Sequence, residues 1–405
     1  MPTQTSVEEL RRRFPALAGP WAFMDNAGGS QVPAVVADAV RDYMLSRYVQ
    51  VGGLYPASVA ATDTVARAHS MVETLMGADD AGRVIIGASS SALCRMLSDV
   101  YAEVLGPGDE VVVAETGHEA NVFPWLSLAN RGVSVRVWKG EMGTGRLRSE
   151  DLKALLSART RIVAFPHVSN ILGAVEDVHT FTQVAHDAGA RVVLDSVAYA
   201  PHRMMSVSDW GVDWCVFSCY KVFAPHMAAL FGRHEALAEV TGRNHPFIPK
   251  EKIPGKFELG GVPHESCAGL VALESYFCEV ASRSSFDRQT VAAAFSVMEE
   301  LEQPLTERLI GFLQGRDGAR IVGPATAGRE RVATVSFIKE GVKSEDIVRH
   351  LLNHQVGIKH GNFYSVRLLE HLGIDVDDGV ARVSFAHYNT HEEVDRLLAG
   401  LGEIV

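Results

Sequence analysis

Two residues suited to chemistry each stand directly after a short apolar run. Asp195 ends the run that begins at Arg191, and Lys221 follows a second run that begins at Trp214. Such runs, broken by a polar turn with Pro225, are typical of buried parallel strands that present a side chain at their carboxyl end. In open α/β sheets, ligands bind beyond the carboxyl ends of the strands. We therefore expect Asp195 and Lys221 to face one crevice.

An acid and a lysine in one crevice suggest a site for pyridoxal 5'-phosphate (PLP). A lysine forms the covalent link to the aldehyde of this cofactor, and a carboxylate pairs with the protonated pyridine nitrogen, so that the ring accepts electrons. The alternative is that Asp195 caps a turn and that Lys221 is a solvated loop lysine. For an isolated strand-end residue this structural interpretation is the more common one, but the surrounding sequence favours the cofactor site.

The sequence around both residues resembles a known family. Residues 194–202 (LDSVAYAPH) and 217–226 (FSCYKVFAPH) resemble the cofactor signature of PLP-dependent class V aminotransferases, in particular their cysteine desulfurase-like branch. The resemblance runs from about Phe23 to the C-terminus. It implies PLP as cofactor, an amino acid as small-molecule substrate, and a homodimer with shared active sites.

The expected fold is an α/β fold of PLP-dependent fold type I. The resemblance implies a large domain with a mostly parallel sheet in residues 20–285. A smaller α+β domain would combine residues 1–19 with residues 286–405. The sequence pattern agrees, because strands near 133–138 and 160–165 alternate with helices near 149–157 and 177–188, as in a parallel sheet wrapped by helices.

Several residues are predicted to bind the cofactor phosphate. Ser89 and Ser90 begin a predicted helix, where unpaired N–H groups attract anions, although serine is also a common helix cap. The resemblance implies that this turn holds the phosphate, together with Ser218 and Tyr220. It also implies that Gly261 reaches the phosphate of the partner subunit, through its backbone alone, because relatives commonly have a threonine there.

The ring of the cofactor is predicted to contact further side chains. The resemblance implies that His118 stacks on the pyridine ring and passes protons near the reacting carbon, and that Asn170 contacts the phenolic oxygen. Without the resemblance, His118 would be a structural histidine and Asn170 a turn former. Relatives usually have a glutamine three residues after the aspartate, where this protein has Ala198. Together with Lys221 and Asp195, His118 completes the predicted catalytic set.

The substrate side of the site is predicted from three segments. The resemblance implies that Asn26 and Ala27 line it and that Arg382 holds the α-carboxylate, a task that suits a planar bidentate donor. The alternative for Arg382 is a solvated group at a sheet edge. Tyr364 stands in or near the position at which cysteine desulfurases carry the cysteine that takes up sulfur as a persulfide.

The matching loop, residues 357–365, contains no cysteine, and no cysteine follows Cys278. A dedicated desulfurase is therefore disfavoured. The leading hypothesis is a carbon–sulfur β-lyase that splits an S-substituted L-cysteine into a thiol, pyruvate and ammonia, similar to lyases that trim cysteine conjugates in specialised metabolism, including lincosamide antibiotic pathways.

The sequence is also compatible with other reactions and with a protein that is not an enzyme. Transamination or decarboxylation-coupled deamination of a similar cysteine conjugate would use the same lysine, aspartate and arginine. A desulfurase with a non-standard sulfur acceptor is a third possibility, and a non-catalytic scaffold on this fold is a fourth.

The composition narrows the setting of the protein. It has 405 residues, of which 47% are hydrophobic and 21% charged, as in a globular protein. A net charge of −11 and the absence of a long basic run argue against nucleic acid or an anionic membrane as partner. No apolar stretch could span a bilayer, and the N-terminus does not resemble a secretory signal. Five cysteines without metal-ligand spacing predict a cytoplasmic protein with reduced thiols and no metal.

Overall fold

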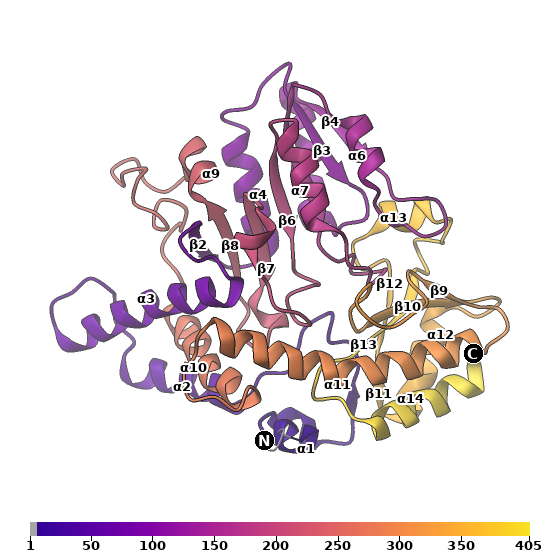
Figure 1. Ribbon diagram of the computed structural model, residues 1–405. Coiled ribbons are helices and arrows are strands. Elements are labelled where there is room, and N and C mark those ends of the chain that lie inside the picture. The colour runs from indigo at the N-terminus through magenta and orange to yellow at the C-terminus, as the bar shows by residue number, and fades with distance from the viewer. Residues whose placement is uncertain (1–5) are drawn as a thin grey trace.

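The computed structural model describes residues 6–405 and is built around a seven-stranded sheet flanked by helices (Figure 1). The strand order is β2-β8-β7-β6-β5-β3-β4, and all neighbours are parallel except β8, which is antiparallel to both β7 and β2. The strands are β2 (Gly82–Gly87), β3 (Glu110–Ala114), β4 (Ser134–Trp138), β5 (Thr160–Pro166), β6 (Arg191–Asp195), β7 (Trp214–Ser218) and β8 (Ala228–Arg233). The predicted α/β fold is confirmed.

Both faces of this sheet are covered, which explains why its strands read as continuous apolar runs. Successive side chains of a strand point to opposite faces. Val192 and Leu194 accordingly belong to the core on one face, whereas Val193 belongs to the core on the other face, which also contains Leu97 of the helix α4. The covering helices are α3 (Pro56–Met76), α4 (Ser90–Tyr101), α5 (Phe123–Leu126), α6 (Ser149–Leu155), α7 (Val178–Asp187), α8 (Val207–Trp210), α9 (His234–Glu239) and α10 (His264–Val280).

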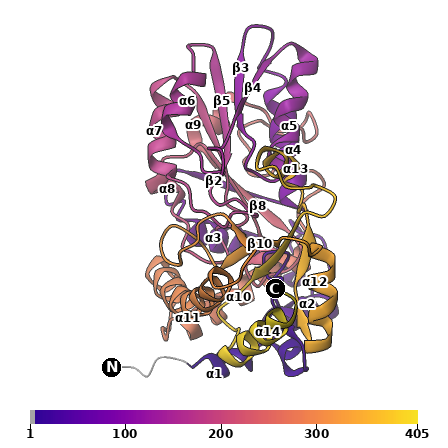
Figure 2. The ribbon, with the colours of Figure 1, turned by 90° about the vertical axis from the view of Figure 1, so that its right-hand side faces the viewer.

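A second, four-stranded sheet lies in the C-terminal part of the protein (Figures 1 and 2). Its strands are antiparallel in the order β12-β13-β10-β9. They are β9 (Ala319–Val322), β10 (Thr334–Lys339), β12 (Lys359–Gly361) and β13 (Val380–Ser384). The helices of this part are α11 (Arg288–Gln314), α12 (Ser344–Leu351), α13 (Val366–His371) and α14 (His391–Ile404). Thr390 and Glu393 form the expected capping box of α14.

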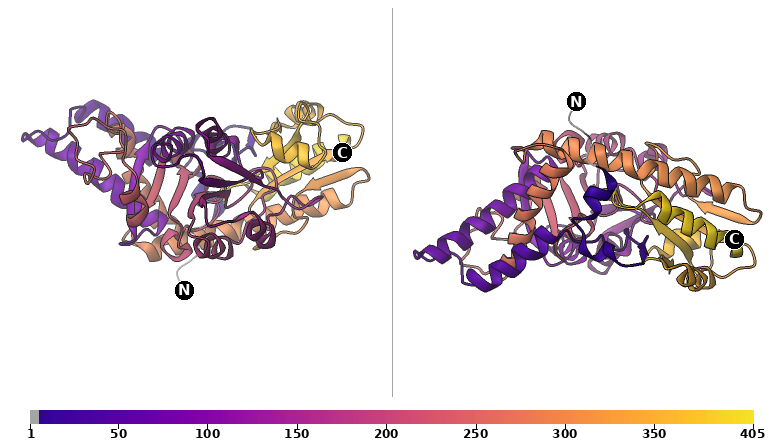
Figure 3. Two further views of the ribbon diagram at one scale, coloured as in Figure 1. Left: turned by 90° about the horizontal axis from the view of Figure 1, so that it is seen from above. Right: turned by 90° about the horizontal axis from the view of Figure 1, so that it is seen from below.

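The N-terminal segment packs against the C-terminal part. After the short helix α1 (Val7–Arg11), strand β1 (Ala22–Phe23) pairs in parallel with β11 (Val356–Gly357). Residues that follow β1 therefore reach the site from the C-terminal side of the molecule. Helix α2 (Ala34–Ser46) and α3 then form a hairpin that projects from the rest of the molecule (Figures 1 and 3). Within residues 6–405, no helix is long and apolar enough to cross a membrane.

Candidate active site

A cleft of about 620 Å³ opens at the carboxyl ends of the central strands. Strands β6 and β7 are parallel neighbours, with Asp195 paired to Val216, and Lys221 ends the 3-10 helix η4 (Cys219–Lys221) directly after β7. The cleft is lined by Ser90, Ser91, His118, Glu119, Ala120, Phe123, Pro166, Val168, Asn170, Asp195, Val197, Ala198, Tyr220, Lys221 and Tyr364. The structure thus brings the predicted lysine and aspartate into one crevice.

The Lys221 side chain is half-buried and lines the cleft. Its Nζ donates to the backbone carbonyl of Ala27 at 2.5 Å. Burial, followed by the positive charge of Arg382, lowers the pKa of Lys221 to about 8, and the carboxylates of Asp195 and Asp25 offset only part of this shift. The unprotonated amine, which is the form that attacks a carbonyl carbon, is therefore more populated near neutral pH than in a solvated lysine.

Asp195 is buried at the end of β6, and its Oδ1 accepts a hydrogen bond from the backbone N–H of Val197 at 2.9 Å. Burial raises its pKa to about 6, against the opposing effects of that hydrogen bond and of Lys221. A cationic group in the cleft would favour the ionised carboxylate. Ala198, in the place of the family glutamine, also lines the cleft but offers only a methyl group.

The start of α4 forms the predicted phosphate end of the cleft. Ser89 is the N-cap of this helix, and its hydroxyl accepts from the N–H of Ala92, so the structural role weighed for Ser89 is the one observed. Ser90 lines the cleft, and the hydroxyl of Ser218 donates to its oxygen at 3.0 Å. Tyr220 lines the cleft beside them. These hydroxyls and the free N–H groups of the first helical turn suit a phosphate.

Gly261 does not line the cleft of its own subunit. It lies in an exposed turn with φ +88°, and no atom of the described residues lies where a side chain at this position would begin. A contact to the phosphate of a partner subunit stays a prediction for this residue.

His118 is held in one tautomer by its own backbone. It caps the 3-10 helix η2 (Glu119–Asn121), and its Nδ1 accepts from the N–H of Ala120 at 3.0 Å. The neutral ring therefore carries its proton on Nε2. Burial, with Lys221 and Arg382 nearby, lowers the pKa of His118 to about 4. The ring faces Tyr364 at a centroid distance of 5.1 Å.

Asn170 fastens the loop that carries Tyr364. Its amide Nδ2 donates to the carbonyl of Phe363 at 2.9 Å, and its Oδ1 accepts from the hydroxyl of Ser365 at 2.9 Å. Phe363 and Tyr364 both have positive φ, +48° and +59°, a backbone conformation that side-chain-bearing residues rarely adopt. Tyr364 is 69% exposed at the mouth of the cleft. Asn170 still lines the cleft, but it also has this structural task.

Arg382 is buried on an inner strand, so the alternative of a solvated edge group is wrong. β13 lies between β12 and β10, and the residue is 3% exposed. Its Nη2 bonds Asp25 at 3.0 Å, its Nη1 donates to the carbonyl of Asn170 at 3.3 Å, and its guanidinium lies 3.7 Å from the ring centroid of Phe363. Its Nε has no partner among the described residues. Arg382 is not among the residues that line the cleft.

Asn26 faces the protein interior. Its amide Nδ2 donates to the carbonyls of Phe23 and Ser384, and its Oδ1 accepts from the hydroxyl of Tyr388. The structure therefore places the side chain of Asn26 in an internal network, and its role on the substrate side stays a prediction. Ala27, the next residue, is oriented by this network and holds Lys221 through its carbonyl.

The structure adds residues that the sequence pattern did not single out. Asp25 and Phe363 frame Arg382, and each stands beside a residue that was selected, Asn26 or Tyr364. Glu119 lines the cleft and forms an ion pair with Arg367 at 3.1 Å. Asp25 and Phe363 could have been found from the sequence, because each is next to a predicted site residue.

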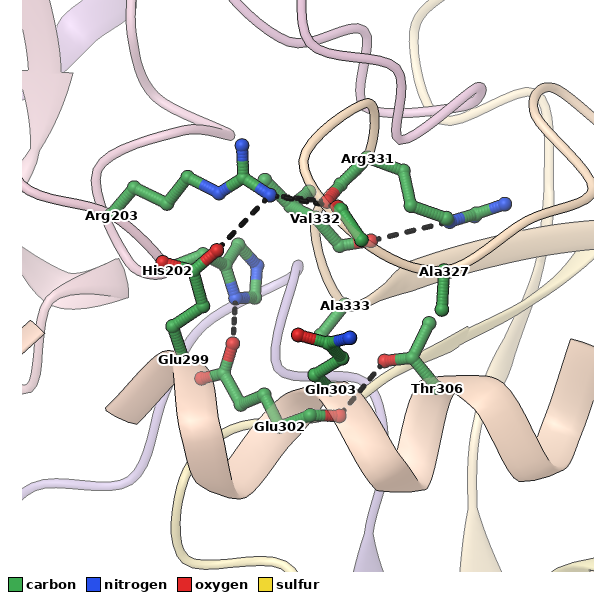
Figure 4. A pocket seen from close by; sticks show the side chains of 11 residues that line it. His202, Arg203, Glu299, Glu302, Gln303, Thr306, Ala327, Arg331, Val332 and Ala333 are labelled. Carbon is green, nitrogen blue, oxygen red and sulfur yellow. Dashed lines mark hydrogen bonds and ion pairs between the residues drawn. The ribbon is translucent and has the colours of Figure 1, made fainter. Parts of the chain in front are cut away.

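A separate small cavity lies between α11 and residues 327–333 (Figure 4). His202 and Glu302 are hydrogen-bonded in it at 2.7 Å, and Arg203 donates to the backbone carbonyl of Arg331 at 2.8 Å. With about 20 Å³ it has room for roughly one water molecule. None of the predicted site residues lines it, so the large cleft is the candidate active site.

The cleft residues fit PLP. One cleft contains an amine with a lowered pKa, a buried carboxylate, and hydroxyl groups at a helix N-terminus. Lys221 would hold the aldehyde end of the cofactor, Asp195 its ring nitrogen, and Ser90 with Ser218 its phosphate.

Comparisons with known proteins agree with this assignment. The model of the aminotransferase class-V family matches residues 22–397. The protein is 36% identical to the aminotransferase-like protein FGM3 of Gibberella zeae over 98% of the length of both. It is 29% identical to a probable cysteine desulfurase of Mycobacterium leprae, over 98% of its own length and 96% of that relative. The fold matches a cysteine desulfurase structure from Thermococcus onnurineus with a TM-score of 0.86 at 24% identity, over 98% of the length of both. The protein therefore belongs to the class-V aminotransferase family of PLP-dependent enzymes.

Proposed function

We propose that this enzyme is a carbon–sulfur lyase that eliminates a thiol from an S-substituted L-cysteine, giving pyruvate and ammonia. The observation that supports this proposal is that no thiol of residues 6–405 lines the cleft. Cys94, Cys215, Cys219 and Cys267 are buried in the cores, and the partly exposed Cys278 lies on α10 away from the cleft. Without an acceptor cysteine, sulfur leaves as a thiol and is not retained by the protein.

Each step of the proposed reaction is assigned to one residue in or next to the cleft. Arg382 receives the α-carboxylate: its buried Nε is without a partner in residues 6–405, and a bidentate bond would form when one Nη exchanges its contact with Asp25 or Asn170 for the substrate. The Lys221 amine removes the proton from Cα, a step that its lowered pKa favours. Bound PLP supplies the electron sink for the electron pair left at Cα. The Nε2–H of the neutral His118 ring would hydrogen-bond the sulfur while the Cβ–S bond breaks with its electron pair on sulfur. The proton that Lys221 took from Cα then neutralises the leaving thiolate.

The overall reaction balances with one water molecule. R-S-cysteine and water give the thiol, pyruvate and ammonium. Transamination or decarboxylation-coupled deamination of the same substrate would leave the C–S bond intact, so the products separate these alternatives.

The enzyme is further proposed to act as a homodimer with shared sites. The α2–α3 hairpin exposes a group of large apolar side chains, among them Leu54, which is 98% exposed, with Leu45 and Tyr48. An apolar patch of this kind on a projecting element is typical of a protein interface. Light scattering of the holoenzyme should give twice the mass of one subunit, and Leu54→Lys should lower that mass and the activity together.

The test uses purified holoenzyme with L-cysteine and a panel of S-alkyl, S-aryl and S-glycosyl cysteines. Pyruvate, alanine, aldehyde, carbon dioxide and free thiol are followed together. The matched variant Cys278→Ser removes the one partly exposed cysteine of the described residues. The proposal predicts pyruvate and thiol from both proteins. Alanine with protein-bound sulfur that Cys278→Ser abolishes would instead establish a desulfurase with an unusual acceptor.

A further inference from the structure

Three side chains of metal-ligating type meet on the surface, away from the cleft. His350 lies in the last turn of α12, His354 ends the following 3-10 helix η5 (Leu352–His354), and Glu403 lies in the last turn of α14. Helices α12 and α14 run side by side, with the C-terminus of the protein at this end (Figures 1 and 2). The cluster belongs to the outer face of the C-terminal part.

The ligand atoms have the spacing of a metal site. Glu403 Oε2 lies 3.0 Å from Nε2 of His350 and 3.4 Å from Nε2 of His354, and all three ligand atoms lie within 4.8 Å of one another. In a tetrahedral zinc site with bonds of about 2.0–2.1 Å, ligand atoms are roughly 3.3 Å apart. The two distances that involve Glu403 are therefore close to this value, and the third, between the two imidazoles, is at most 4.8 Å.

The backbone around the cluster favours a cation. The last carbonyl groups of a helix carry a partial negative charge. His350 and Glu403 lie in the last turns of α12 and α14, so the C-terminal ends of both helices are near the cluster. A cation there would be attracted by these carbonyl groups in addition to the carboxylate of Glu403.

A glycine in α14 makes room for one of the histidines. A Cβ at Gly400 would lie 2.7 Å from Cδ2 of Leu351 and 2.9 Å from Cδ2 of the His354 ring, closer than packed atoms approach. Glycine inside a helix costs about 1 kcal/mol relative to alanine. Here it lets the imidazole of His354 pack against the backbone of α14, close to Glu403.

Two arginines close to the cluster in sequence or in space have partners other than Glu403. Arg349 forms an ion pair with Glu345 on its own helix, and the guanidinium of Arg316 lies over the ring of Phe312, 4.3 Å from its centroid. Glu403 is bonded instead to the two histidines. The histidine side chains are about one quarter exposed and Glu403 is 57% exposed, which leaves an open path from solvent.

We propose that His350, His354 and Glu403 form a surface site for a zinc ion, with water completing the coordination. Imidazole nitrogen and carboxylate oxygen are ligands that zinc accepts in tetrahedral geometry. The bound ion would tie the end of α12 and η5 to the C-terminal helix. Because zinc would bind the folded protein at a site absent from the unfolded state, it should raise the unfolding temperature.

The test is calorimetric titration of tag-free, PLP-loaded enzyme with zinc chloride near neutral pH. We expect one zinc ion per subunit and a rise in the unfolding temperature that EDTA reverses. His350→Ala, His354→Ala and Glu403→Gln should each weaken binding at least about tenfold, the lower end of what loss of even an outer-shell partner costs. His234→Ala, an exposed histidine on α9, is the matched control and should bind like the wild type.

Two results would overturn the proposal. One is the absence of stoichiometric zinc binding to the wild type. The other is a His350→Ala/His354→Ala double variant that binds zinc as the wild type does. Far-UV circular dichroism and the absorbance of the lysine-bound cofactor show that each variant is folded, since none of the three residues lines the cleft.

Discussion

The guanidinium of Arg382 and the carboxylate of Asp25 lie 3.0 Å apart, although 357 positions separate them in the sequence. Two residues after Asp25, the carbonyl of Ala27 accepts a hydrogen bond from the Lys221 amine. A segment of three residues therefore contacts both the proposed carboxylate-binding arginine and the cofactor lysine. Because β1 precedes this segment and pairs with β11, the C-terminal part of the molecule positions it.

Replacing Arg382 with lysine tests the proposed carboxylate contact. Lysine keeps the positive charge but loses the bidentate geometry of guanidinium. We expect KM for the amino acid to rise about 10- to 100-fold, equivalent to about 1.4 to 2.7 kcal/mol, with a smaller change in kcat. Steady-state kinetics on Arg382→Lys provides the measurement, and Arg320→Lys, on the edge strand β9, is the control. An unchanged KM would exclude Arg382 from the substrate site.

The substitution Asp195→Asn should affect protein stability and cofactor binding differently. The pKa of Asp195 is raised to about 6 in the folded protein, so the folded state holds its proton more tightly than the unfolded state between pH 4 and 6. The free energy of unfolding therefore falls as pH rises through that window. Above pH 6, the buried ionised carboxylate lowers the free energy of unfolding by about 3 kcal/mol. Asparagine removes this cost.

We expect cofactor-free Asp195→Asn to unfold at the same or a higher temperature than the cofactor-free wild type at pH 7, while PLP affinity and activity fall. Differential scanning calorimetry and cofactor titration measure the two effects. Asp63→Asn, at an exposed position on α3, should change neither. A marked loss of stability in Asp195→Asn would mean that the carboxylate supports the fold and is not held there for the cofactor.

The rate of PLP attachment should report the titration of Lys221. Its pKa is lowered to about 8, and only the unprotonated amine attacks the cofactor aldehyde. In cofactor-free protein the attachment rate should rise from about pH 7, reach half of its maximum near pH 8 and level off above about pH 9. The same shift makes the cofactor-free protein more stable as pH rises from about 8 toward 10, since the unfolded state binds the extra proton there. A rate that rises only near pH 10 would place the amine in contact with water.

Asn26→Ala tests the internal role of Asn26. The substitution leaves the hydroxyl of Tyr388 and the carbonyl of Ser384 without their buried partner. Such losses cost about 1–3 kcal/mol each, so we expect the free energy of unfolding to drop by about 3 kcal/mol. Denaturant unfolding measures this, with Gln31→Ala as a nearby control that keeps its backbone bond to Tyr388. A raised KM with unchanged stability would instead make Asn26 a substrate contact.

Local patterns were sufficient to predict the centre of the site. Asp195 and Lys221 each follow an apolar strand, and parallel neighbouring strands bring such residues together without further information. The strands near 110–114 and 160–165 were predictable for the same reason. The antiparallel strand β8 was not foreseen, because an apolar run does not reveal its direction.

Other features depend on contacts between distant parts of the sequence. Whether Arg382 is exposed depends on the order of strands in its sheet, and its partner Asp25 is near the other end of the sequence. The role of Asn26 depends on Ser384 and Tyr388, which come more than 350 positions later. The role of Gly261 depends on a second subunit.

The ratio of thiol to pyruvate tests the central claim most directly. Holoenzyme would be incubated with one S-substituted L-cysteine that it accepts, and thiol, pyruvate, alanine and carbon dioxide would be quantified over time. The proposal predicts thiol and pyruvate in equal amounts from the first turnover, with no alanine and no carbon dioxide. Carbon dioxide with an aldehyde that retains the sulfur, or a keto acid that retains it, would contradict carbon–sulfur elimination.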